Sequence, residues 1–111
     1  MIDPTFNPGV DGLVSTLSVQ ADGRILLGGT FANVAGTARA NLARLTAAGA
    51  IDSAFTAVTN GSVFALQLLP DGKILIAGSF TTVSGTARNR LARLNADGSV
   101  DTTFTASVGD G

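Results

Sequence analysis

Residues 71–80 read Asp-Gly-Lys-Ile-Leu-Ile-Ala-Gly-Ser-Phe, and this stretch decides the fold of the chain. Asp-Gly between apolar runs is a strong signal for a tight β-hairpin turn. The residues that follow are almost all apolar, which is typical of a strand covered on both faces. Residues 22–31 read Asp-Gly-Arg-Ile-Leu-Leu-Gly-Gly-Thr-Phe, so the same signal occurs twice, with Asp22 placed 49 positions before Asp71.

The repeat extends outward from this stretch over nearly the whole chain. In the second copy, the mostly apolar residues 63–69 predict a buried strand before the turn, and residues 91–94 and 100–104 predict two short strands after it. The polar residues 81–90 predict a loop. We expect type I′ turns, with positive φ at both central residues, at Asp22-Gly23 and Asp71-Gly72, and a further turn at Asp97-Gly98.

Four antiparallel strands in a unit of this length describe one blade of a β-propeller. A parallel β-helix has shorter coils and lacks regular Asp-Gly hairpins, which disfavours that solenoid. We therefore predict an all-β chain of two β-propeller blades, each a four-stranded antiparallel sheet. The predicted boundaries are an outer strand and linker at residues 1–12, a first blade at 13–55, a second blade at 62–104 and a tail at 105–111, with the strands of the first blade at 13–20, 24–31, 41–46 and 51–55.

The ordered residues of the repeat also resemble a known family. In the second copy they comprise residues 71–80, the loop residues Gly85 and Arg88, and the segments 91–94 and 97–104. This set is similar to the delta-60 repeat of bacterial β-propeller proteins, and the first copy fits the same pattern. The resemblance implies a propeller fold and no particular reaction. Family members usually carry more repeats in one chain, so two complete repeats are a departure.

Two blades leave an apolar face open on each side of the pair, and such a face associates with another surface. We expect identical chains to form a closed ring. When the same contact is repeated around a rotation axis, every apolar face is covered by a neighbouring copy. Residues 2–6 predict a spare outer strand that either pairs with a neighbouring subunit or hangs free. Three copies would give six blades and four copies eight. We favour the homotrimer over the homotetramer because small residues on the inner strands permit close approach, namely Ser15, Ser18, Gly28, Gly29, Ala65 and Gly78.

The composition excludes several classes of partner. A net charge of −1 gives no electrostatic basis for binding nucleic acid or an anionic membrane. The chain has no cysteine, which removes disulfides and thiolate metal sites. No apolar run approaches the roughly 18 residues of a membrane span, and the N-terminus lacks the pattern of a signal peptide. The compartment stays undetermined.

The aspartates are expected to serve structure. Four of them, Asp11, Asp22, Asp71 and Asp97, precede or flank glycine in turns, and no calcium-loop spacing occurs, so we predict no metal site and no cofactor. Asp52 and Asp101 stand at the same point of the last strand, and Arg44 and Arg93 lie on the strand before it. We predict two structural cross-strand ion pairs, Arg44 with Asp52 and Arg93 with Asp101.

The loop motif Gly-Thr-Ala-Arg, which ends at Arg39 and at Arg88, is intact in both copies. On a ring these arginines would present several guanidinium groups on one face, where a carboxylate or polyanion would bind. Alternatively, each arginine caps carbonyl groups of its own loop or holds the loop to the next blade. We favour the structural interpretation, because a dedicated site rarely needs every copy of a repeat.

Enzymatic activity is not expected. The chain has no His, Cys, Glu or Tyr, so the groups able to act as a general base reduce to Asp and the single Lys73. Our first hypothesis is a self-assembling structural module, a natural-derived or engineered propeller fragment, that forms a closed homo-oligomeric ring. The two copies differ at about half of their positions, which disfavours a design from identical blades. The alternative is an interaction domain that binds a protein, a peptide or a small polyanion through the loop face of the ring.

Overall fold

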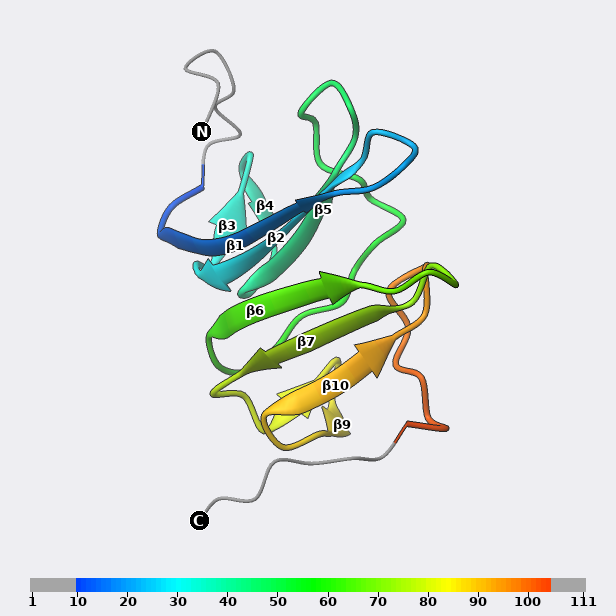
Figure 1. Ribbon diagram of the computed structural model, residues 1–111. Helices are drawn as coiled ribbons and strands as arrows, with labels where there is room; N and C mark the ends of the chain where they lie inside the picture. The colour runs from blue at the N-terminus through cyan, green and yellow to red at the C-terminus, as the bar shows by residue number, and fades with distance from the viewer. Residues whose placement is uncertain (1–9, 105–111) are drawn as a thin grey trace.

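The computed structural model describes residues 10–104, and within this range the chain consists only of strands, turns and loops. Two three-stranded antiparallel sheets repeat each other along the chain (Figure 1). In each sheet the most apolar strand lies in the middle, where both of its edges are hydrogen-bonded. The first blade contains β1 (Leu13–Val19), β2 (Ile25–Thr30) and β5 (Leu42–Leu45), and the second blade contains β6 (Val63–Leu68), β7 (Ile74–Gly78) and β10 (Leu91–Leu94).

The outermost strand of each blade is shorter than predicted. It makes a single bridge with the strand before it, at Ile51 in the first blade and at Val100 in the second. In the first blade the Asp52 carboxylate accepts a hydrogen bond from the N–H of Ala54 at 3.1 Å, and the N–H of Phe55 donates to the Asp52 carbonyl at 3.1 Å. These bonds turn the chain out of the sheet. The strands predicted at residues 51–55 and 100–104 are therefore corrected to one bridge each.

The Asp-Gly turns also differ from the type I′ turns that we predicted. Only the glycine has positive φ, which is 89° at both Gly23 and Gly72. In the first turn the Gln20 N–H donates to the Arg24 carbonyl at 2.7 Å, and the Gly23 N–H donates to the Gln20 carbonyl at 2.9 Å. This is the three-residue hairpin loop that ends in a left-handed glycine. The Asp22 carboxylate accepts the Arg24 N–H at 3.0 Å, which keeps the aspartate at ordinary negative φ.

Type I′ geometry occurs instead in the segments that we predicted to be loops. Ala35 and Gly36 have φ of 52° and 78°, and Ser84 and Gly85 have φ of 49° and 81°. Each pair closes a hairpin whose strands are only two residues long, too short to show an alternating pattern in the sequence. These hairpins are β3 (Asn33–Val34) with β4 (Thr37–Ala38), and β8 (Thr82–Val83) with β9 (Thr86–Ala87).

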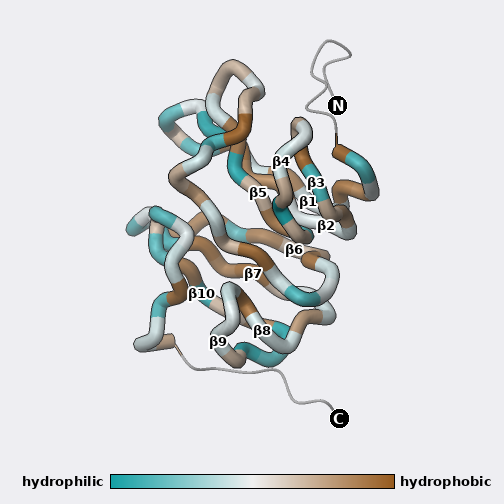
Figure 2. The backbone as a smooth tube through the Cα atoms, turned by 180° about the vertical axis from the view of Figure 1, so that it is seen from behind, coloured by the Kyte–Doolittle hydropathy of each residue, from teal (hydrophilic) through white to brown (hydrophobic). Residues whose placement is uncertain are grey.

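The two blades pack against each other through a shared apolar core. β1 lies beside β6, and one buried cluster includes Leu26 and Leu42 of the first blade together with Ile76 of the second. Gly28 permits this approach, because a Cβ at that position would lie 2.7 Å from Cγ1 of Val63. Seen from behind, apolar residues concentrate on the strands and polar residues at the turns (Figure 2).

Burial differs between the blades although their sequences match. All four residues of β5 are buried, whereas burial alternates along β10. Ala92 and Leu94 of β10 face the first blade and are buried, while Leu91 and Arg93 on the other side are half-buried. The second blade therefore has one face that no other part of the described chain covers.

Our prediction that residues 63–69 form a buried strand was wrong for one side of that strand, which lies on the same uncovered face. Val63 and Leu66 are buried at the junction between the blades, but Ala65 and Gln67 are exposed, and Phe64 is 58% exposed. The sequence marked both faces as apolar, and only one face has a neighbour within the described chain.

Both ends of the chain lie partly outside the described residues. The spare outer strand predicted at residues 2–6, with its exchange between subunits, and the tail at 105–111 fall there. Of the predicted linker, Val10 is described, and it forms a bridge with Val34 of β3. The start of the described chain is thus fixed to the first small hairpin.

Candidate functional site

Arg44 lies at the junction between the two blades. Its Nε donates to Oδ2 of Asp52 at 2.8 Å, and its side chain is only 7% exposed. Its Nη1 donates to the carbonyl of Ala96 in the second blade at 2.6 Å, so the guanidinium links the blades. The guanidinium carbon lies 4.8 Å from the centroid of the Phe55 ring, which is cation–π geometry. Arg24 adds a second cation, with Nε 3.3 Å from Oδ2 of Asp52.

The second blade repeats this arrangement with one partner missing. The Nε of Arg93 donates to Oδ2 of Asp101 at 2.8 Å, and the guanidinium carbon lies 4.7 Å from the centroid of the Phe104 ring. Lys73 takes the place of Arg24, with Nζ 3.2 Å from Oδ2 of Asp101. Within the described part of the chain, no carbonyl accepts a hydrogen bond from the terminal nitrogens of Arg93, whose side chain is 27% exposed.

Both aspartates of these ion pairs have lowered pKa values. At Asp52 burial alone would raise the pKa, but the hydrogen bond from Arg44, the N–H of Ala54 and the nearby positive charges outweigh it. At Asp101 the hydroxyl of Thr103 has the largest effect, and further hydrogen bonds overcome the opposing effect of burial to lower the pKa strongly. Both carboxylates are therefore held in the charged form.

We expect the stability of the chain to decline as the pH falls below about 4, since a free Asp has a pKa of about 3.9. Between the folded and unfolded pKa values of Asp52 and Asp101, the unfolded chain binds more protons than the folded chain. Stability is therefore fully present above the unfolded pKa and is lost as the pH falls toward the folded one. Thermal unfolding followed from pH 7 down to pH 2.5 checks this. Asp52→Asn should weaken the pH dependence, whereas Asp71→Asn in an exposed turn should retain it; a melting temperature constant over the whole range would contradict it.

One apolar face of the blade pair lies on β1, and we call it the first-blade face. It consists of Val14, Leu17 and Val19, which are 42%, 43% and 60% exposed. The counterparts of the first two are Val63 and Leu66, which pack at the internal junction and are only 0% and 9% exposed. Equivalent side chains are thus covered in the second blade and uncovered in the first.

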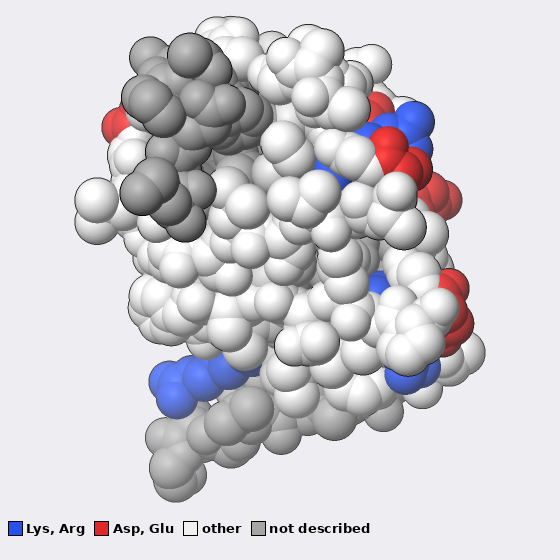
Figure 3. Space-filling model, turned by 45° about the horizontal axis from the view of Figure 1, so that its top comes forward, with Lys and Arg blue, Asp and Glu red and all other residues white. Residues whose placement is uncertain are grey.

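The other uncovered face, which we call the second-blade face, lies on the opposite side of the pair. It consists of Leu75, Ala77, Leu91 and Arg93, which share one face of the β7–β10 ladder. Its apolar residues and Ala65 line a shallow groove of about 130 Å³. The charged side chains visible in Figure 3 lie near the edges of the molecule, and most of the surface in that view is uncharged.

The structure places Arg39 and Arg88 at the ends of the two small hairpins. Their Nη1 atoms donate to the carbonyls of Ala38 and Ala87, at 2.8 Å and 2.7 Å. The Nε atom of each is buried and has no hydrogen-bond partner within residues 10–104. Each guanidinium is therefore engaged with its own hairpin and keeps a buried Nε–H that is unpaired within residues 10–104.

Two residues fasten these hairpins, a role that was not predicted: Asp11 was expected only to stand in a turn, and Asn60 was not singled out. Asp11 accepts the N–H of Asn33 at 3.0 Å, and Asn60, its counterpart in the second copy, accepts the N–H of Thr82 at 3.0 Å. The bonds from Asn33 and its neighbour lower the pKa of Asp11. The available signal was an Asp or Asn placed before glycine at the same point of both copies, because such side chains cap turning backbone.

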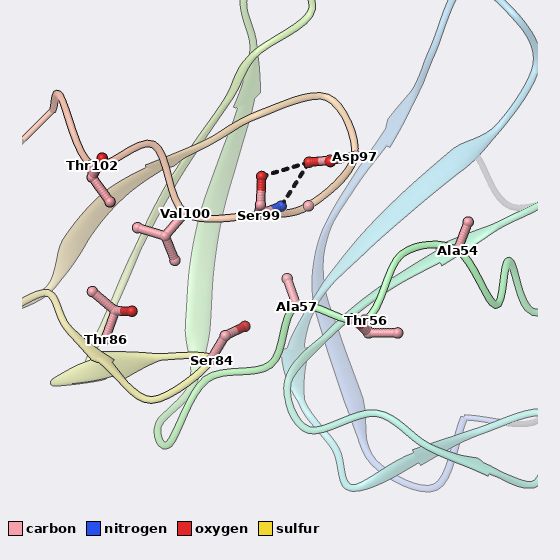
Figure 4. A pocket seen from close by; sticks show the side chains of 10 residues that line it. Ala54, Thr56, Ala57, Ser84, Thr86, Asp97, Ser99, Val100 and Thr102 are labelled. Atoms are coloured by element: carbon pink, nitrogen blue, oxygen red, sulfur yellow. Dashed lines mark hydrogen bonds between the residues drawn. The ribbon is translucent and has the colours of Figure 1, made fainter.

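An open pocket of about 480 Å³ lies between the segment that joins the blades and the outer part of the second blade (Figure 4). Its one carboxylate, Asp97, accepts the N–H and the hydroxyl of Ser99 at 2.9 Å and 2.7 Å, and these bonds lower its pKa. Residues 10–104 also bring together no group of three or more His, Cys, Asp or Glu that could hold a metal ion. The pocket is otherwise lined by Ala54, Thr56, Ala57, Ser84, Thr86, Gly98, Val100 and Thr102.

The repeated sheets and their matched arginine sites have the character of propeller blades. A family model described as a β-propeller domain of unknown function (DUF5122) matches residues 20–55 and 69–104. The chain belongs to this family. The two matches fall on the two copies of the repeat. They confirm the predicted propeller-type repeat and the predicted all-β fold class. Comparison with curated proteins and with solved structures found no match. Among the described residues of this DUF5122 chain, no helix is long and apolar enough to cross a membrane.

Proposed function

We propose that this DUF5122 chain is a non-enzymatic structural module that closes into a β-propeller ring with identical copies of itself. The observation that carries the proposal is the pair of uncovered apolar faces on opposite sides of the blades. The first-blade face exposes Val14, Leu17 and Val19, and the second-blade face exposes a groove beside Arg93. Two blades cannot cover their own outer faces, so each face needs a neighbour.

The two faces differ, and this favours a ring over a symmetric pair. A contact between unlike faces joins copies head to tail. The copies form a closed ring when the rotations between successive copies add up to one full turn. Three copies would give six blades, and four would give eight. We favour three, because Gly28 lets Val63 approach closely at the internal junction. The small side chains of Ser15 and Ser18 likewise permit a neighbouring strand to approach β1 closely.

The environments of the charged groups support the absence of catalysis that we propose. Asp52 and Asp101 each face two cations, and their lowered pKa values make them poor general bases near neutral pH. Lys73 is engaged by Asp101 and by Oδ1 of Asn95, to which its Nζ donates at 2.7 Å. These groups are engaged in ion pairs and hydrogen bonds within their own blades.

The native mass in solution tests the proposal. Light scattering coupled to size exclusion should give a particle of three or four times the chain mass of 11.1 kDa. The mass should fall toward that of one chain on dilution, as mass action requires. A folded particle of one chain at every concentration, or a particle of two chains, would contradict the ring.

A further inference from the structure

The junction inside the chain shows how two blades of this repeat pack against each other. It places Arg44 and Phe55 of the first blade under the turn at residues 95–99 of the second, where the Arg44 Nη1 donates to the Ala96 carbonyl. Packing is close, because a Cβ added to Gly98 would lie 2.9 Å from Cδ2 of Phe55. As a result, Phe55 is fully buried.

The arginine and the phenylalanine of that junction recur on the second-blade face. Arg93 and Phe104 stand 49 positions after Arg44 and Phe55 and keep the same ring contact, 4.7 Å against 4.8 Å. They lack the cover, since the Arg93 side chain is 27% exposed against 7% for Arg44. The second-blade face is therefore built like a junction that lacks its other half.

The missing half is present at the other end of the same chain. The turn at residues 46–50 is the counterpart of the turn at 95–99, with Gly49 and Gly98 at φ of 90° and 93°. The N–H of Gly49 donates to the Thr46 carbonyl at 2.9 Å, as in the later turn. Within the described residues, the carbonyl of Ala47 accepts no hydrogen bond, whereas the carbonyl of its counterpart Ala96 accepts one from Arg44.

We infer that a second copy of this chain seats its turn 46–50 and its first-blade face on the second-blade face of the first copy, where Arg93 donates to the Ala47 carbonyl. This inference rests on the proposed ring and specifies its contact. Val14 and Leu17 of the incoming copy then take the places that Val63 and Leu66 hold internally. Leu75 and Leu91 of the receiving copy take the places of Leu26 and Leu42.

One position shows that the two junctions are not identical. Ala77 stands where the internal junction has Gly28, so its Cβ meets Val14 of the incoming copy. Some of the space is recovered, because Ala65 replaces Thr16, whose Cγ2 would lie 2.8 Å from a Cβ at Gly28. The contact between copies is therefore less closely packed than the internal one and is the first to open on dilution.

Disulfide trapping tests the arrangement, because the chain has no cysteine of its own. At the internal junction the hydroxyls of Thr30 and Ser62 lie 2.6 Å apart. Their counterparts across the junction between copies are Ser79 of one copy and Leu13 of the next. An oxidised mixture of Leu13→Cys and Ser79→Cys chains, carrying tags of different size, should give dimers of one chain of each kind.

The controls separate this inference from the ring itself. The double variant Thr30→Cys with Ser62→Cys should form its disulfide within one chain and show that trapping works at this geometry. If the wild-type mass is that of a ring but the mixture gives no mixed dimer, or Leu13→Cys chains couple to each other, the inferred contact is wrong and the ring closes differently. A single-chain mass would overturn the proposed function as well.

The role of Arg93 has its own readout. Arg93→Lys keeps a positive charge beside Asp101. A lysine lacks the planar set of N–H donors with which a guanidinium can bond Asp101 and the Ala47 carbonyl at once. Loss of one charge-assisted hydrogen bond should weaken association about tenfold or more, measured as the concentration at which the particle dissociates. A dissociation constant equal to that of the wild type would remove Arg93 from the contact.

Discussion

Replacing Phe55 with alanine is expected to remove a large part of the stability of the chain. The ring is fully buried, contacts the Arg44 guanidinium and packs against the backbone of Gly98. Truncating a buried Phe to Ala costs about 3–5 kcal/mol, which for a domain of this size lowers the melting temperature by about 12 °C or more. Thermal unfolding at a fixed protein concentration measures the loss. A decrease below about 1 kcal/mol would show that the internal junction contributes little.

Phe104→Ala is the matched variant, because Phe104 holds the same position against Arg93. In an isolated chain the ring is half-buried, so its removal should cost clearly less than the removal of Phe55. In the assembled particle the two costs should approach each other, since a second copy covers Phe104. Comparing the two variants above and below the dissociation concentration therefore reports on the contact between copies.

Leu75→Asp is expected to abolish assembly while leaving the chain folded. Leu75 lies on the second-blade face and is half-buried in the single chain, so a carboxylate there still reaches water. In the ring the same carboxylate would be buried in an apolar contact beside Arg93, whose guanidinium is already engaged by Asp101, at a cost of several kcal/mol. Association should weaken by about 100-fold or more, and light scattering should report the mass of one chain.

Ser53→Asp is the control for this change. Ser53 is exposed on the outer segment of the first blade and is not among the residues of either uncovered face, and the substitution adds the same charge. Its particle should keep the wild-type mass and melting temperature. Equal masses for the Leu75 variant and the wild type would show that the second-blade face is not the assembly surface.

The sequence was sufficient to predict the blades because their signals are local and occur twice. The apolar strand at residues 73–80 and its copy require cover on both faces, which only stacked sheets provide. The pairing of Arg44 with Asp52 followed from their positions on adjacent strands, and the structure places these groups 2.8 Å apart. Repetition made each inference testable against a second copy.

The remaining features could not be predicted, because they depend on side-chain and backbone contacts that leave no pattern in the sequence. The hairpin loop at Gly23 is accompanied by a hydrogen bond from the Arg24 N–H to the Asp22 side chain, a contact that the residue pattern did not reveal. The hairpin at Ala35 and Gly36 is two residues deep on each side, so no periodicity marked it. The bond from Arg44 to Ala96 joins residues 52 positions apart and required the packing of both blades.

The symmetry of the assembled particle tests the central claim most directly. A crystal structure of the particle should show a closed ring of six or eight blades, in which every first-blade face meets the second-blade face of the next copy. A particle in which two first-blade faces meet across a two-fold axis, leaving the second-blade faces uncovered, would contradict the account.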